Sequence, residues 1–144
     1  MCGIAGIINY RHDPVKDILN MNQAMLHRGP DAGAYWLDAE QKVVLGHRRL
    51  SIVDLSVNGA QPMKSANERY MIVFNGEIYN YKDLEQRLRQ DSCELHLRGS
   101  SDTEVILEAF SFYGVEKTLS LMKGMFAIAL YDRRENQLYL MRDR

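Results

Sequence analysis

The sequence has 144 residues, of which 46% are hydrophobic and 26% are charged, and its formal net charge at pH 7 is -1. A chain of this length and composition forms about one globular domain with its own core, which excludes a disordered, collagen-like or coiled-coil protein. The charge balance lacks the basic excess of proteins that bind nucleic acid or anionic membranes, and no apolar run approaches the roughly 18 residues of a membrane helix. The amino end has no basic start followed by a cleavable apolar segment, so we expect a cytoplasmic protein with no membrane or nucleic-acid partner.

The amino-terminal part of the chain predicts a strand followed by a helix. Residues 2–10 form an apolar run with two glycines, which is typical of a buried strand. A helix is expected to begin at Asp13-Pro14, with Asp13 as its cap, because proline suits the first helical position. An apolar stripe with helical spacing then continues until Gly29-Pro30 ends the helix.

Short strands are predicted in the middle of the chain, at residues 34–37, 42–46 and 70–74. Asn75-Gly76 follows the last of them, and this pair is the strongest two-residue turn signal in the sequence. We therefore expect a tight turn at Asn75-Gly76.

The carboxyl-terminal part predicts two helices and then a hairpin. One helix is expected to begin with Asn80 as its cap and Asp83 as the acidic third residue, and to carry Leu84 and Leu88. A second is expected after a cap at Ser101 or Asp102. The second helix should end at Gly114, and residues 125–132 and 137–142 should pair as a β-hairpin. Strands with segregated helices favour an α+β fold over a doubly wound parallel sheet. The last strand runs directly into Arg144, which predicts a chain cut inside its fold.

The two cysteines, Cys2 and Cys93, are too few for a disulfide framework, and the four histidines lack the spacing of a helical metal site. We therefore expect no metal. Cys93 alternates with Leu95 and Leu97, which indicates a buried strand residue.

Cys2 can act as a nucleophile for a physical reason. Removal of the initiator methionine would make it the first residue of the chain, with a free α-amine beside its thiol. An α-amine is partly neutral near pH 7 and can accept the thiol proton directly or through water, as in enzymes with an amino-terminal threonine. The apolar strand that follows would hold this end of the chain in place.

Four further segments accompany Cys2: HRGPD (27–31), GHRRLSIVDLSVNGAQPM (46–63), FNGEIYNY (74–81) and GSSDTE (99–104). Each alone could be an ordinary turn, solvated stretch or helix cap. Together, and in this order after MCGIAG, they resemble the glutaminase domain of the class II glutamine amidotransferases, whose nucleophile is the amino-terminal residue. The segment MCGIAGI alone is also compatible with the amidotransferases that make glucosamine 6-phosphate or phosphoribosylamine. HRGPD and HRRLSIVDLS with GAQPM favour the asparagine synthetase type, and the resemblance runs from Cys2 to Arg144.

This resemblance implies how glutamine would be hydrolysed to glutamate and ammonia. Cys2 would attack the side-chain amide and form a thioester, with its α-amine as base and then as acid to ammonia. Asn75, through its side-chain amide, and Gly76, through its backbone N–H, would form the oxyanion hole.

The resemblance also assigns residues that bind the substrate. Arg49 would bind the α-carboxylate of glutamine in bidentate fashion, and its choice over Arg48 comes from the match to the family. Asp102 would bind the α-ammonium with Glu77 close by. The backbone groups of three residues would line the slot for the side chain: Leu50, Ile52 and Val53.

The fold that the resemblance implies is a four-layer α/β/β/α sandwich of two antiparallel sheets, the N-terminal-nucleophile hydrolase fold. Residues 1–144 would be an incomplete glutaminase domain, and exposed edge strands would allow a homodimer. The family continues into a carboxyl-terminal synthetase domain that uses ATP and Mg, whereas the glutaminase domain itself needs no cofactor. The alternatives are the glutaminase part of a sugar or other amidotransferase, and a catalytically silent fragment that keeps the fold.

Overall fold

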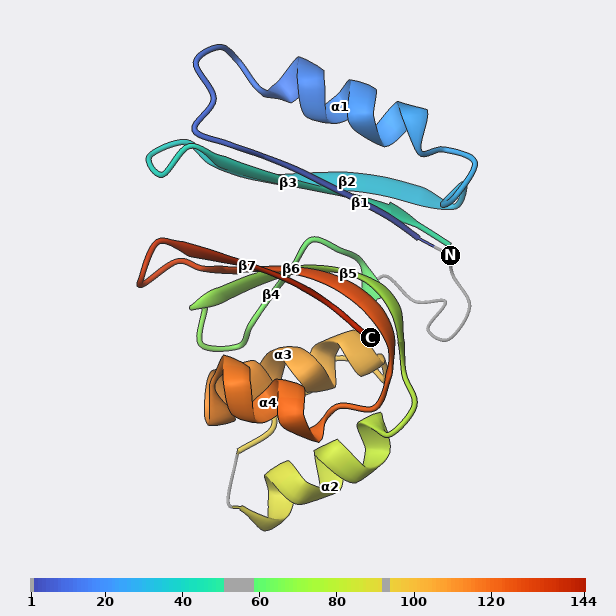
Figure 1. Cartoon of the computed structure of the whole chain (residues 1–144), viewed down its shortest axis with the longest axis vertical. Helices are drawn as coiled ribbons and strands as arrows, with labels where there is room; N and C mark the ends of the chain where they lie inside the picture. The colour runs from blue at the N-terminus through green and yellow to red at the C-terminus, as the bar shows by residue number, and fades with distance from the viewer. Residues whose placement is uncertain (1, 51–58, 92–93) are drawn as a thin grey trace.

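The computed structural model describes residues 2–50, 59–91 and 94–144, and it has four layers (Figure 1). Helix α1 (Val15–Ala24) covers a three-stranded sheet, which packs on a four-stranded sheet, and three helices cover the far side of the second sheet. Both sheets are antiparallel, so the α+β class and the sandwich that the sequence predicts are confirmed.

The first sheet has the strand order β1-β3-β2. Its members are β1 (Gly3–Ile8), β2 (Ala32–Asp38) and β3 (Val43–Arg49). The second sheet has the order β4-β5-β6-β7 and consists of β4 (Met63–Lys64), β5 (Tyr70–Ile78), β6 (Gly124–Asp132) and β7 (Gln137–Arg142). The outer helices are α2 (Tyr81–Gln90), α3 (Asp102–Tyr113) and α4 (Val115–Leu121).

Strand β5 is central because it is buried on both faces. Met71 and Val73 belong to the core between the two sheets, whereas Ile72 and Phe74 belong to the core between the second sheet and the helices. Side chains alternate along a strand, and burial of both faces explains the unbroken apolar run of residues 70–74. The next side chain, that of Asn75, falls on the face that looks toward the first sheet.

The predicted turn at Asn75-Gly76 is wrong, because β5 continues through both residues to Ile78 and pairs with β6 along its whole length. Gly76 instead allows the backbones of β5 and β6 to lie close together. Its φ is 156°, and a Cβ at this position would overlap the carbonyl oxygen of Met125 on β6. A glycine that suits a turn is thus used for the contact between two strand backbones.

Two other predictions about the amino-terminal part need correction. Strand β1 exists, but it lies at a sheet edge and is only partly buried, with Ile8 52% exposed. Helix α1 begins at Val15, one residue later than predicted, with Pro14 at the cap position. The Val15 N–H still donates to Asp13 Oδ1, and the helix ends at Ala24. Tight turns replace the last expected helical turn because Gly29 must lie against the backbone of β3.

The predictions for the carboxyl-terminal part agree better with the structure. Ser101 Oγ accepts the N–H of Glu104 at the start of α3, Gly114 ends that helix, and the β6–β7 hairpin forms as expected. Asn80 precedes α2, but its side chain bonds to Leu121 and Lys123 instead of capping the helix. The short elements β4 and α4 were not predicted, because their sequences show no periodic pattern. Cys93, predicted to be a buried strand residue, lies outside the described residues.

The β6–β7 hairpin depends on a buried carboxylate. Asp132 is fully buried and accepts hydrogen bonds from two Arg69 nitrogens, at 2.9 and 2.6 Å, and from the backbone N–H groups of Arg134 and Glu135. Burial by itself would raise the pKa of Asp132, but these donors outweigh it and hold the pKa below its usual value.

We predict that Asp132→Ala lowers the free energy of unfolding by about 3 kcal/mol, because four donors lose their acceptor in a buried place. Lys64→Ala is the control, since it removes an ion pair to Glu68 that is open to solvent and should contribute little to stability. Urea unfolding measures both. Equal losses for the two variants would contradict the role given to Asp132.

Candidate active site

Cys2 lies directly before strand β1 and is held there by neighbours from distant parts of the chain. Its half-buried Sγ accepts the N–H of Leu50 at 3.4 Å and lies 3.8 Å from the Leu50 carbonyl oxygen. Its own carbonyl accepts a hydrogen bond from Arg28 Nε at 3.1 Å. The thiol is thus fixed against the end of β3, beside a backbone donor that can stabilise negative charge on sulfur.

The HRGPD segment lies against the end of β3. A Cβ at Gly29 would overlap the backbone of Arg48 and Arg49, so only glycine allows this approach. The Arg48 guanidinium donates to the carbonyls of Gly29 and Pro30, and the Asp31 N–H donates to the Arg49 carbonyl. These bonds place Arg28 where it reaches Cys2.

The two arginines of HRRL lie on opposite faces of β3. Val43, Leu45 and His47 face the second sheet, and Arg49 follows them at the strand period of two. Arg48 falls on the other face, toward α1, where it bonds the Gly29–Pro30 turn. Arg49 lines a small cavity of about 40 Å³, together with His47 and Gln61.

Asn75 and Gly76 reach the site from the second sheet. Asn75 is partly buried, and its Oδ1 is buried without a hydrogen-bond partner among the residues that the structure describes. Gly76 is exposed and pressed against β6. The amide of Asn75 points to the side of the first sheet, which also carries Cys2 and Arg49.

Asp102 lies at the start of helix α3, close to the end of β5. Its Oδ2 accepts the N–H of Ile78 at 2.9 Å, and its Oδ1 accepts the N–H of Thr103 at 2.8 Å. Burial raises the pKa of Asp102, the two N–H donors oppose the rise, and the nearby Glu77 carboxylate adds to it. Both oxygens keep a lone pair for a further donor.

The predicted residues therefore form two groups: Cys2 with Leu50, and Asn75 to Glu77 with Asp102. His47 connects the groups, because its Nε2 lies 3.2 Å from the carbonyl oxygen of Phe74 on the other sheet. Within the described part of the chain, no hydrogen bond joins Cys2 to Asn75. Ile52 and Val53 lie outside the described residues.

Sequence reasoning missed His47 and Gln61. Both are buried, and Gln61 bonds Phe74 and Thr103 through its side-chain amide. In the sequence, the only signal for these two residues was that His47 belongs to HRRL and Gln61 to GAQPM. A polar side chain that is buried needs hydrogen-bond partners, but the sequence does not show which residues are buried.

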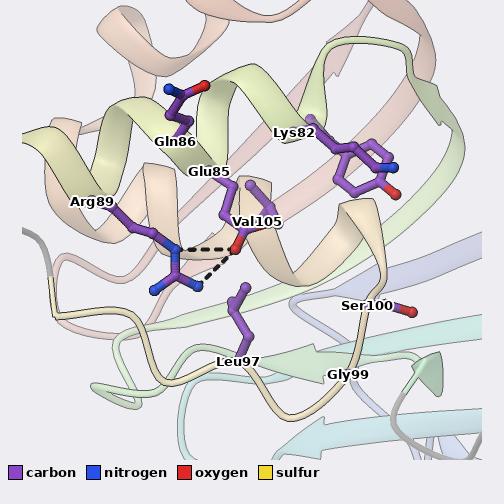
Figure 2. Close-up of a pocket in the computed structure, with 9 residues that line it drawn as sticks. Lys82, Glu85, Gln86, Arg89, Leu97, Gly99, Ser100 and Val105 are labelled. Carbon is purple, nitrogen blue, oxygen red and sulfur yellow. Dashed lines mark hydrogen bonds and ion pairs between the residues drawn. The ribbon is translucent and has the colours of Figure 1, made fainter.

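A larger cavity lies elsewhere, between α2 and the segment that leads to α3 (Figure 2). It encloses about 560 Å³ and is open to solvent, with the Glu85–Arg89 ion pair on one wall. None of the predicted site residues that the structure describes lines it. Its lining residues are Tyr81, Lys82, Glu85, Gln86, Arg89, Leu97, Gly99, Ser100 and Val105.

Among residues 2–50, 59–91 and 94–144, no group of three or more histidine, cysteine or acidic side chains could hold a metal ion. Within the same residues, no helix is both long and apolar enough to cross a membrane.

A family model described as the glutamine amidotransferase domain matches residues 1–144. Glutamine-hydrolysing asparagine synthetase 1 of Bacillus subtilis is 40% identical over 149 residues, which cover 99% of this chain and 22% of the relative. Asparagine synthetase B of Escherichia coli is 38% identical, and the match covers 99% of this chain and 25% of the relative. Amidase chry2 of Gibberella zeae is 34% identical, and the match covers 100% of this chain and 23% of the relative. The chain thus spans about a quarter of the length of these relatives.

A solved structure has a similar fold. Glutamine phosphoribosylpyrophosphate amidotransferase from Bacillus subtilis superposes with a TM-score of 0.68 at 22% sequence identity, and the match covers 92% of this chain and 35% of that chain. It supports the fold assignment alone.

The buried His47 gives a testable pH dependence. Burial lowers the pKa of His47 from 6.5 to about 4, Arg49 and Arg48 contribute, and the bond to Phe74 opposes the shift. Because the folded pKa is the lower one, the unfolded chain binds a proton that the folded chain excludes between about pH 6.5 and 4. Stability is full above this window and falls as the pH drops through it.

We predict that His47 accounts for about 2 kcal/mol of the unfolding free energy lost between pH 7.5 and pH 5. His47→Gln should remove this part of the loss, whereas His96→Gln, at an exposed position, should keep it. Urea unfolding at the two pH values measures it. The same pH dependence in His47→Gln and the unchanged protein would contradict the prediction.

Proposed function

The chain belongs to the glutamine amidotransferase domain family, and on that premise we propose that it hydrolyses the side-chain amide of glutamine to glutamate and ammonia. The observation that carries the proposal is the place of Cys2. Its Sγ lies beside the Leu50 N–H at the end of β3, and Asn75 lies on the face of β5 that looks toward the same sheet.

The reaction uses the cysteine thiol and its own α-amine. The thiol proton moves to the amine, and Sγ attacks the amide carbon to give a tetrahedral intermediate. The C–N bond then breaks, the amine returns the proton to the leaving nitrogen, and ammonia departs from a thioester. Water attacks the thioester, glutamate leaves and the thiol is restored. The base exists only after Met1 is removed, because an amide nitrogen has no basic lone pair.

Asn75 and Gly76 provide the oxyanion hole in this proposal. The negative charge of the intermediate develops on the former amide oxygen, and two fixed N–H donors stabilise it. The closeness of Gly76 to β6 supports the assignment, since a side chain at that place would displace the strand that carries both donors.

Arg49, Asp102 and Glu77 select free glutamine by the charges at its two ends. The position of Arg49 on the face toward the second sheet supports its role over that of Arg48, which bonds the Gly29–Pro30 turn. Asp102, with Glu77 beside it, would bind the α-ammonium, and the pairing would favour the ionised carboxylate of Asp102. Backbone groups of Leu50, Ile52 and Val53 would line the side-chain slot.

The acceptor of the ammonia belongs to a further domain. The relatives named asparagine synthetases are about four times longer than this chain, so we propose a carboxyl-terminal synthetase domain that uses ATP and Mg and passes ammonia to aspartate. A second candidate function is transfer of the ammonia to a different acceptor, because one of the relatives is named an amidase, chry2. A homodimer and a cytoplasmic location stay predictions.

We predict that 6-diazo-5-oxo-norleucine, an electrophilic analogue of glutamine, labels Cys2 once per chain in preparations whose intact mass shows that Met1 is removed. Cys2→Ala should lose both labelling and glutamine hydrolysis while keeping its thermal unfolding midpoint, because only a sulfur at a strand end is removed. Ammonia release and mass spectrometry measure the two effects. Glutamine hydrolysis by Cys2→Ala at the rate of the unchanged protein would refute the proposal, and a protein that is neither labelled nor active would be the silent fragment.

A second prediction separates catalysis from binding. Asn75→Ala should lower kcat by about 100- to 1,000-fold with a smaller change in KM, because its donor acts on charge that develops in the transition state. Arg49→Lys should mainly raise KM, because the bidentate contact is lost while the charge remains. Steady-state kinetics with glutamine measure both. The opposite pattern would mean that the two roles are exchanged.

A further inference from the structure

The backbone of Phe74, the residue before Asn75, is bonded by side chains in place of a strand. Strand β4 pairs with β5 only at Met71 and Ile72, and the N–H and C=O of Phe74 point to the same edge, beyond the end of β4. Gln61 Oε1 accepts the Phe74 N–H at 2.6 Å, and His47 Nε2 lies 3.2 Å from the Phe74 carbonyl oxygen. The peptide groups on both sides of Phe74 are therefore held by side chains.

Gln61 reaches this position because it continues the line of β4. Met63 lies opposite Ile72, so two residues earlier the register would bring Gln61 opposite Phe74. Its side-chain oxygen takes the place of the backbone acceptor that a longer strand would have supplied. The side chain is only 8% exposed, so a lost bond could not be replaced by bulk water at low cost.

The other end of Gln61 is anchored to helix α3. Gln61 Nε2 donates to Thr103 Oγ1 at 3.3 Å, and the neighbouring Asp102 bonds the N–H of Ile78. The start of α3 is thus tied to β5 at two places, through Gln61 at Phe74 and through Asp102 at Ile78. Asn75, Gly76 and Glu77 lie between these ties.

We propose that Gln61 is a positioning residue for glutamine hydrolysis: by holding the Phe74 N–H, it sets the place of Asn75 relative to the oxyanion. The inference rests on the proposed function of Asn75. Small displacements of a positioned group can cost about 100-fold in rate, whereas binding of the substrate ends depends on Arg49 and Asp102. Loss of Gln61 should therefore act on kcat through Asn75.

Gln61→Met tests this, because it keeps the length of the side chain and removes both hydrogen-bonding atoms. We expect kcat for glutamine to fall by about 10- to 100-fold and KM to change by less than about threefold. Gln90→Met, at an exposed position on α2, should leave both unchanged. The rates are measured below the thermal unfolding midpoints of all variants, so that the folded proteins are compared.

A double variant separates positioning from a general structural role. In the Asn75→Ala background, Gln61→Met should lower kcat by less than about twofold, because the group that it positions is already absent. Wild-type kcat in folded Gln61→Met, or a full additional loss in the Asn75→Ala background, would overturn the proposal.

Thr103→Val serves if Gln61→Met does not fold, because it releases the anchor of the Gln61 side chain. It also removes the hydroxyl contact of Thr103 with the Asp102 carboxylate, which should act on KM and not on kcat. It should lower kcat by about 3- to 10-fold, with no further loss in the Asn75→Ala background. An unchanged kcat would overturn the inference. Full activity of Asn75→Ala would instead refute the oxyanion assignment and the inference with it, whereas a slow Asn75→Ala beside a fully active Gln61→Met refutes the inference alone.

Discussion

Residues 70–74 and Ile78 of strand β5 are buried, so their backbone groups must find partners inside the protein. Strand β6 pairs with β5 along the whole of one edge, but β4 pairs with the other edge only at Met71 and Ile72. Beyond that point the partners are side chains, from Gln61 and His47 at Phe74 and from Asp102 at Ile78. The cost of an unbonded buried peptide thus determines which polar residues gather around Asn75.

The candidate site lies where the two sheets meet, because neither sheet holds all of the chemistry. The first sheet carries the thiol of Cys2 and the guanidinium of Arg49, and the second carries Asn75 and Gly76. Relative placement of the groups depends on contacts between the sheets, among them the bond from His47 to Phe74. Burial keeps His47 neutral near pH 7, since it lowers the pKa to about 4. The contact between the sheets then adds no charge near the site.

Neighbouring residues with the same chemistry have different tasks because a strand alternates its faces. Arg48 faces α1 and bonds the turn that brings Arg28 to Cys2, whereas Arg49 faces the second sheet. The same alternation separates Phe74, which packs under the helices, from Asn75, which faces the first sheet. One motif therefore supports the structure through Arg48 and also places Arg49 on the face of the candidate site.

The sequence by itself determined the fold class, the helices after Pro14, Asn80 and Ser101, the last hairpin, and the segments that make up the site, because local periodicity, caps and motif order are written in neighbouring residues. The arrangement of the segments depended on tertiary structure. Asn75-Gly76 has the composition of a turn, yet it became strand because β6 offers partners on both sides of it and approaches too closely for a side chain at Gly76. His47 and Gln61 could not be assigned partners in advance, since those partners are 27 and 13 residues away. Long-range burial and pairing decide such positions, and no local pattern encodes them.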